Sequence, residues 1–246
     1  MKIAVCFFGE CTFLDRFMIQ NFIRCIVLPF QKHVPEKVEF FYIFHSYMDV
    51  EVLGIIDRMK TFFPFTVLTL HNKEFVLREV DENLSLYLQD YSLQRVKRMW
   101  KRCMLSLDLV ICSRLDLLFS RPLSASDVEA MVFHKNHLFI SNSPSLEQCF
   151  VVGDPFVMNL YTDRLHYVEE HGTEFSIADL IQIHPMIKSS TVSTVFVRIL
   201  PDGIVHPQDS HVSPYLNDLI KSSCTRICLR KMNSKMKTEP SKTKEA

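Results

Sequence analysis

The chain has 246 residues, of which 48% are hydrophobic and 23% charged, a composition too apolar for a disordered protein. Its 28 basic and 28 acidic side chains cancel, which argues against a protein that binds nucleic acid over its whole surface. The longest apolar runs contain about seven residues, whereas a membrane-spanning helix needs roughly 20, so no membrane span is predicted.

Short apolar runs alternate with helical patterns in the first half of the chain, as in an α/β fold with a mostly parallel sheet. A first strand, rather than a signal peptide, opens the chain. Pro29 is expected to end the first helix. The expected strands are residues 2–8, 38–44, 65–70 and 107–112, and the expected helices are 12–28, 50–61 and 84–105.

The second half continues the same alternation. Asp154 followed by Pro155 predicts a helix start, because Asp is favoured at the N-cap and Pro at the first helical position. Residues 226–246 are basic and are expected to form a disordered tail, which leaves one domain over residues 1–225. The other expected elements are a short helix from Ser126, strands at 137–140, 149–152 and 193–200, and a helix over 176–187.

The eight cysteines show no Cys-x-x-Cys spacing, and several lie in apolar runs, which favours a reducing compartment and a cytoplasmic location. Cys224 and Cys228 lack the second pair that a zinc site needs. The helix over 84–105 carries a basic side from Arg95 to Arg102. Such a side is typical of a solvated face, with anion binding as the alternative.

The segment from Leu109 to Asp116 is the most informative for chemistry. An apolar strand ends there in Arg114 and Asp116, whose side chains share one face of an extended segment. Ligands bind beyond the carboxyl ends of parallel strands, where Arg114 can meet a phosphate and Asp116 can offer an oxygen to Mg²⁺ or Mn²⁺. The alternative interpretation is a salt bridge at the end of the strand.

Three stretches resemble a family of glycosyltransferase-like proteins with the GT-A fold, found among large DNA viruses and microbes. They are residues 2–9, residues 41–47, and Asp108 to Leu123 with Tyr91 to Leu93 before it. Residues 196–203 are similar to the closing strand of that family. The resemblance spans about residues 1–205.

The resemblance implies a soluble GT-A-like, Rossmann-like domain that transfers a sugar from a nucleotide-sugar donor to a glycan or protein acceptor, in the host cytoplasm if the protein is viral. Mn²⁺ or Mg²⁺ would be held by Asp116 with His206, although a polar loop is the alternative for His206. Asp154 and Asp179 are the candidate catalytic bases, and Asp154 could instead serve only as a helix cap. The candidate donor-binding residues are Phe8, Gly9, Arg16, His45, Ser46 and Arg114, with a structural role as the alternative for His45.

Several positions depart from the family pattern. The family usually has an arginine soon after the first-strand glycine, where this chain reads Glu10-Cys11-Thr12 and the nearest arginine is Arg16. An Asn-Asp-Arg-Phe stretch is replaced by residues 147–150, and a later glutamate could be matched only by Asp179 or Glu174. These departures favour a second hypothesis, a catalytically inactive GT-A-like binding or assembly protein. A nucleic-acid partner is a weaker third hypothesis.

Overall fold

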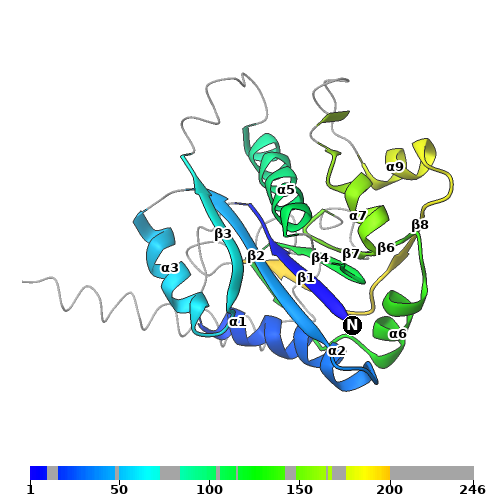
Figure 1. Ribbon diagram of the computed structural model, residues 1–246, viewed down its shortest axis with the longest axis horizontal. Helices are drawn as coiled ribbons and strands as arrows, with labels where there is room; N and C mark the ends of the chain where they lie inside the picture. The colour runs from blue at the N-terminus through cyan, green and yellow to red at the C-terminus, as the bar shows by residue number, and fades with distance from the viewer. Residues whose placement is uncertain are drawn as a thin grey trace, which may run out of the picture.

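The computed structural model describes residues 1–9, 16–47, 50–72, 84–103, 106–114, 116–141, 148–164, 166–167 and 176–199. These residues build one domain around a seven-stranded sheet with the strand order β3-β2-β1-β4-β7-β6-β8 (Figure 1). The strands are β1 (Lys2–Phe7), β2 (Glu39–Tyr47), β3 (Phe65–His71), β4 (Leu109–Ser113), β6 (His137–Ile140), β7 (Phe150–Gly153) and β8 (Lys188–Thr191).

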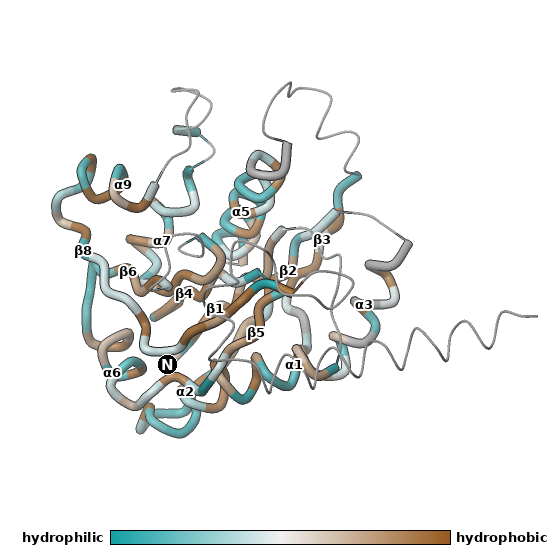
Figure 2. The backbone as a smooth tube through the Cα atoms, turned by 180° about the vertical axis from the view of Figure 1, so that it is seen from behind, coloured by the Kyte–Doolittle hydropathy of each residue, from teal (hydrophilic) through white to brown (hydrophobic). Residues whose placement is uncertain are grey.

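The sheet is mostly parallel, as predicted. β1 pairs in parallel with β2 and β4, and β2 pairs in parallel with β3. Only β7 runs against its neighbours, β4 and β6. β1 lies in the middle of the sheet, and every residue after Lys2 is buried, which explains its nearly continuous apolar sequence. The central strands are accordingly among the most hydrophobic parts of the trace (Figure 2).

Helices cover both faces of the sheet. α5 (Leu84–Arg102), α7 (Pro155–Tyr161) and α9 (Ile177–Ile183) lie on one side in Figure 1. The other side carries α1 (Arg16–Phe22), η1 (Ile23–Val27), α2 (Leu28–His33), α3 (Val50–Lys60) and α6 (Ala125–Phe133). Successive side chains of β1 point to opposite faces of the sheet, which explains the two layers of helices. Val5 and Phe7 pack on the side of α1, and Ala4 and Cys6 pack on the side of α5.

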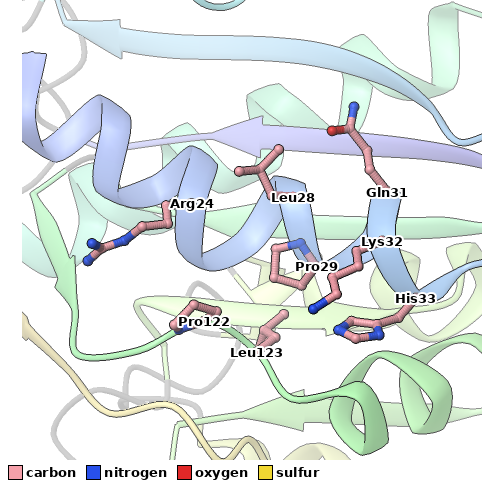
Figure 3. A pocket seen from close by; sticks show the side chains of 8 residues that line it. All are labelled: Arg24, Leu28, Pro29, Gln31, Lys32, His33, Pro122 and Leu123. Atoms are coloured by element: carbon pink, nitrogen blue, oxygen red, sulfur yellow. The ribbon is translucent and has the colours of Figure 1, made fainter.

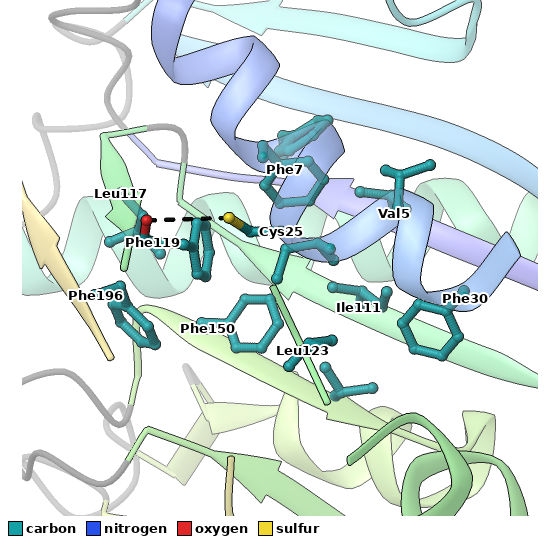
Figure 4. Close-up of a cluster of buried hydrophobic side chains, with 14 of the residues drawn as sticks. Val5, Phe7, Cys25, Phe30, Ile111, Leu117, Phe119, Leu123, Phe150 and Phe196 are labelled. Carbon is teal, nitrogen blue, oxygen red and sulfur yellow. Dashed lines mark hydrogen bonds between the residues drawn. The ribbon is translucent and has the colours of Figure 1, made fainter. Parts of the chain in front are cut away.

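A small antiparallel sheet of β5 (Leu117–Phe119) and β9 (Phe196–Arg198) closes the core on the α1 side. Figure 4 shows aromatic rings from β1, β5, β7 and β9 meeting side chains of η1 and α2. The Asn21 amide makes two hydrogen bonds to the backbone of Phe119, at 2.9 and 2.8 Å. This buried side chain therefore acts as a strand partner for β5.

The prediction that Pro29 ends the first helix is wrong. The helix continues through Pro29 to His33, because a π-helical turn, η1, comes directly before α2. Pro29 has no N–H to donate to the carbonyl of Cys25, four residues earlier. The Leu123 N–H donates to that carbonyl instead, at 2.9 Å.

Other differences are smaller. The predicted helix over 176–187 ends at Ile183, and Lys188–Thr191 forms the unpredicted edge strand β8. The predicted strand over 193–200 is shortened to Phe196–Arg198. No helix in the described ranges is long and apolar enough to cross a membrane. Cys224, Cys228 and the predicted tail at 226–246 lie outside the described residues.

Candidate functional site at the carboxyl edge of the sheet

The strand order changes direction at β1, since β2 and β3 extend to one side and β4 lies on the other. In open α/β sheets, ligands bind outside the carboxyl ends of the strands at such a point. Gly9 follows β1 there with φ of 95°, a backbone conformation that favours glycine. A Cβ at Gly9 would meet no atom within 4 Å, so backbone conformation is what requires a glycine here.

Arg114 lies directly after β4, beside this point. Phe7 is level with Ser113 in the β1–β4 pairing, which brings Gly9 and Arg114 to the same edge. The Arg114 guanidinium donates through Nε to Oδ1 of Asp116 at 2.9 Å and through Nη2 to Oδ2 at 2.6 Å. Its Nη1 donates to Oε1 of Gln89, on α5, at 2.9 Å. Arg114 and Asp116 therefore share one face, as predicted, and they form the salt bridge that was the alternative interpretation.

Asp116 does not offer a free oxygen to a divalent cation in this arrangement. Both carboxylate oxygens accept guanidinium hydrogen bonds, and the residue is 8% exposed. Among the described residues, no three His, Cys, Asp or Glu side chains come together as a metal-binding group. His206, the predicted second ligand, lies outside the described residues. The residues around Asp116 therefore do not fit a metal while Arg114 occupies the carboxylate.

His45 is the centre of a hydrogen-bonded chain that starts at Gly9. The Gly9 N–H donates to Oγ of Ser92 at 2.8 Å, and this oxygen lies 2.6 Å from Nδ1 of His45. Nε2 of His45 lies 3.1 Å from Nδ1 of His71. Burial, together with the charges of His71 and Arg95, lowers the pKa of His45 from 6.5 to about 3. His45 is therefore neutral at physiological pH.

Tyrosine rings surround the histidine pair. The Tyr91 hydroxyl lies 3.3 Å from Nδ1 of His71, and its ring packs against those of His71 and Tyr87. The Tyr47 ring meets the His45 ring edge to face, and its hydroxyl donates to the backbone carbonyl of Leu88. The end of β2 and β3 is thus an aromatic and histidine-rich cluster rather than a purely hydrophobic one.

Helix α5 positions most of these groups. Gln89, Tyr91, Ser92 and Arg95 lie within two turns of it, while its apolar face packs on the sheet through residues that include Leu93, Val96 and Trp100. Two ion pairs also hold the helix, one of them fully buried. The Arg164 guanidinium lies 3.4 Å from the Asp90 carboxylate, with side chains 2% and 1% exposed, and Nζ of Lys97 lies 2.6 Å from Asp163.

Three other predicted donor-binding residues are placed by the structure. Phe8 is buried in the core beneath α5, and its N–H donates to the Ser113 carbonyl at 3.3 Å. Ser46 is buried near the end of β2. Arg16 begins α1 on the opposite face, with its guanidinium 5.7 Å from the centre of the Phe62 ring.

The structure does not bring Asp154 to this edge. Because β7 is antiparallel to β4, with Gly153 level with Val110, Asp154 follows its strand at the opposite edge. Its carboxylate accepts hydrogen bonds from the N–H groups of Phe156, Val157 and Asn136 at 2.9, 3.1 and 2.6 Å. The predicted helix cap is confirmed.

Asp179 lies in the first turn of α9, which packs against α7. Its carboxylate and the Ser176 hydroxyl form a capping box, and hydrogen bonds from Ser176 lower the pKa of Asp179. Residues 10–12, Glu147, Glu174 and His206 lie outside the described residues.

Sequence reasoning missed His71, Ser92 and Gln89 as members of the cluster. A signal for His71 was present, since it directly follows the third predicted strand, as His45 follows the apolar part of the second. The carboxyl ends of parallel strands share one edge, so the same rule that selected His45 selects His71.

A separate pocket of about 460 Å³ lies on the other face, between α2 and the segment before α6 (Figure 3). Arg24, Lys32 and His33 contribute its basic side chains, and Pro29, Pro122 and Leu123 line it with apolar atoms. Since these residues belong to the face opposite α5, this pocket is distinct from the cluster at the carboxyl edge.

The structure is similar to several solved glycosyltransferases. They include the galactosyltransferase LgtC in complex with donor and acceptor sugar analogues, with a TM-score of 0.40 and 10% identity over 78% of this chain and 73% of that one. Mouse xyloside xylosyltransferase 1 in its apo form has a TM-score of 0.38 and 10% identity, over 76% and 84%. The glycosyltransferase GlyE of Streptococcus pneumoniae TIGR4 has 0.39 and 10%, over 77% and 45%. No protein-family model and no curated protein matches the sequence. These likenesses concern the fold alone.

Proposed function

We propose that this chain is a GT-A-type glycosyltransferase whose nucleotide-sugar donor binds along the carboxyl edge of β1 and β4. One observation carries the proposal, the Arg114 guanidinium beside the Gly9 turn where the strand order reverses. The sequence resemblance over residues 1–205 supports the same assignment. The acceptor is a hydroxyl of a glycan or a protein.

In the proposed reaction, the acceptor oxygen forms a bond to the anomeric carbon while the bond from that carbon to the diphosphate oxygen breaks. The electron pair of the broken bond leaves with the diphosphate, and the hydroxyl proton of the acceptor passes to an oxygen of that departing diphosphate. The developing negative charge is the main barrier, and a fixed guanidinium at that position lowers it. In this scheme Asp116 and Gln89 are positioning residues, because they hold three nitrogens of Arg114 in place.

Metal assistance through Asp116 and His206 stays a prediction. Both oxygens of Asp116 already accept hydrogen bonds from the Arg114 guanidinium, so a divalent cation there would compete with that positive charge. We therefore propose that Arg114 stabilises the negative charge of the leaving group, and we assign no step to a metal.

The proposal is tested by donor binding. UDP-, GDP- and CMP-linked sugars are titrated into the purified chain, followed by thermal stability and calorimetry, once with Mn²⁺ and once with EDTA. One donor class should bind, and Arg114→Gln should weaken it about tenfold or more, the loss expected for charge-assisted hydrogen bonds. Arg121→Gln is the matched control, since Arg121 is exposed and donates to the Ser193 carbonyl.

Two results decide between the roles of Asp116. Donor binding that persists in EDTA and falls in Asp116→Asn assigns this residue to the positioning of Arg114. Binding that requires Mn²⁺ in the wild type and that Mn²⁺ no longer supports in Asp116→Asn identifies the carboxylate as a metal ligand. If no donor class binds and no sugar nucleotide is hydrolysed, the glycosyltransferase proposal is wrong.

A second candidate function is a GT-A-like protein that binds a nucleotide sugar without transferring it. Two observations favour it. The Asp116 carboxylate is bound by the Arg114 guanidinium, and Asp154 caps a helix at the other edge of the sheet. The same titrations separate the two functions. Donor binding that depends on Arg114, with neither hydrolysis nor transfer to any glycan or protein acceptor, supports the binding protein.

A further inference from the structure

Arg95 carries a positive charge that meets no carboxylate within the part of the chain that the structure describes. Its Nη2 donates to the Tyr91 hydroxyl at 2.5 Å, and its guanidinium carbon lies 4.8 Å from the centre of the Tyr91 ring. Its Nε is buried and has no hydrogen-bond partner there. A buried donor without a partner is rare in folded proteins, so this one requires an explanation.

His71 lies close enough to Arg95 for the positive charge of the guanidinium to act on the imidazole. Its Nδ1 is within hydrogen-bond distance of Nε2 of His45 and of the Tyr91 hydroxyl, whereas no described residue bonds its Nε2. Among the described residues, His71 contacts the His45 ring from β2 and the Tyr91 ring from α5, and the charge of Arg95 from α5 also acts on it. None of them is acidic, so the described cluster contains a cation and two histidines but no balancing anion.

We propose that Arg95, His71 and the Tyr91 hydroxyl form an anion-binding subsite for a phosphate or carboxylate group. It lies at the end of β3, three strand spacings or about 14 Å across the sheet from the end of β4, where Arg114 lies. This inference does not depend on sugar transfer, because it follows from the charges and hydrogen bonds of this cluster alone.

The bound anion is expected to bring a proton to His71. Burial and the charge of Arg95 lower the pKa of His71 in the structure as it stands. An anion beside Arg95 offsets that charge and favours the protonated imidazole. The chain of hydrogen bonds can accept this proton, because His45 can donate through Nδ1 to Ser92 while Ser92 donates to the His45 carbonyl oxygen, 3.3 Å away. Nε2 of His45 then accepts from Nδ1 of His71.

The test is a titration of the full chain with inorganic phosphate, followed by the imidazole NMR signals of His71 at several pH values, with chloride at equal ionic strength as the reference. Phosphate should shift the His71 signals and raise the pKa of His71. Calorimetry in two buffers of different ionisation enthalpy should show proton uptake on binding. Arg95→Gln should weaken phosphate binding about tenfold, the loss expected for one charge-assisted hydrogen bond.

Arg98→Gln is the matched control, since Arg98 lies one turn further along α5 and is exposed. It should change the affinity for phosphate by less than about twofold, as expected for an isolated exposed charge. Arg95→Lys keeps the charge and should retain part of the binding, which provides a test if Arg95→Gln does not fold. The proposal is overturned if phosphate leaves His71 of the wild type unchanged, or if Arg95→Gln and Arg98→Gln bind equally well.

A nucleoside diphosphate then identifies the source of the anion. If the donor carries it, UDP should shift the His71 signals in the wild type but not in Arg114→Gln, while uridine has no effect. If the anion is a free phosphate, inorganic phosphate should shift His71 equally in the wild type and in Arg114→Gln. A failure of every sugar donor to bind would refute the proposed function but would leave the phosphate result at His71 standing.

Discussion

The two edges of the central sheet use polar side chains in different ways. At the edge where Asp154 lies, two carboxylates bond to the backbone. Asp154 caps α7, and Asp108 accepts from the Lys2 N–H at 2.7 Å. At the carboxyl edge, side chains from separate elements bond to one another, as in the Gly9–Ser92–His45–His71 chain and the Arg114–Asp116 pair.

This difference separates residues that the fold needs from residues that it merely tolerates. A backbone N–H at a helix start must find an acceptor, so a cap stabilises any fold that contains that helix. A cluster of histidines, tyrosines and an arginine that meets no carboxylate among the described residues fills no such need, and apolar residues of similar size would serve packing as well. The carboxyl edge is therefore the part of the molecule in which function is to be sought.

The strongest test of this contrast removes the anchor of α5. Arg164→Met leaves the Asp90 carboxylate buried without its guanidinium and should lower the free energy of unfolding by about 3 to 5 kcal/mol. The double variant Asp90→Leu, Arg164→Met should recover most of this loss, because a well-packed apolar pair replaces buried charges at little cost. Urea unfolding measures both. A double variant no more stable than the single one would contradict the view that the loss comes from an uncompensated buried charge.

A smaller effect is expected at the opposite edge. Asp154→Ala removes the acceptor for three N–H groups and should lower the free energy of unfolding by about 2 kcal/mol. Donor binding by the folded fraction should stay within twofold of the wild type, as measured by calorimetry below the melting temperature. A large loss of donor affinity at unchanged stability would place Asp154 in the site after all.

The third and smallest effect concerns how the free energy of unfolding depends on pH below neutrality, through His45. The pKa of His45 is about 3 in the folded protein against 6.5 ordinarily, so the unfolded chain binds the extra proton between these values. Stability is therefore fully present above pH 6.5 and falls as the pH drops, by about 1 kcal/mol over the first unit below it. His45→Gln should flatten this part of the stability curve, whereas His33→Gln, at an exposed position, should leave its slope unchanged.

The layering of the fold could be predicted from the sequence because it rests on local patterns. The apolar run of β1, the Asp154 cap and the alternation of strands and helices are all short-range signals. The direction of β7 is not a short-range signal, because the sequence of a strand does not show whether it pairs with its neighbour in parallel or antiparallel. That is why the sequence could name Asp154 as a candidate catalytic base although it lies at the edge opposite Arg114.

The candidate site was predictable only in part for the same reason. Arg114 and Asp116 share a face, as their spacing of two requires, but the spacing does not distinguish two residues that bind a ligand from two that bind each other. The cluster around His45 depends on how α5 rotates over the sheet, which is set by contacts such as Asp90 with Arg164 across more than 70 residues of chain.

Pro29 connects the first helical segment to a much later part of the chain. The carbonyl of Cys25 and the amide of Asn21 find their partners at Leu123 and Phe119, nearly 100 residues further on. During synthesis, the N-terminal helices thus leave the ribosome with these groups still bonded to water, and they can complete their hydrogen bonding only when residues 119–123 have emerged. A fragment that stops before residue 119 should hold this helical segment loosely, however well its own sequence favours a helix.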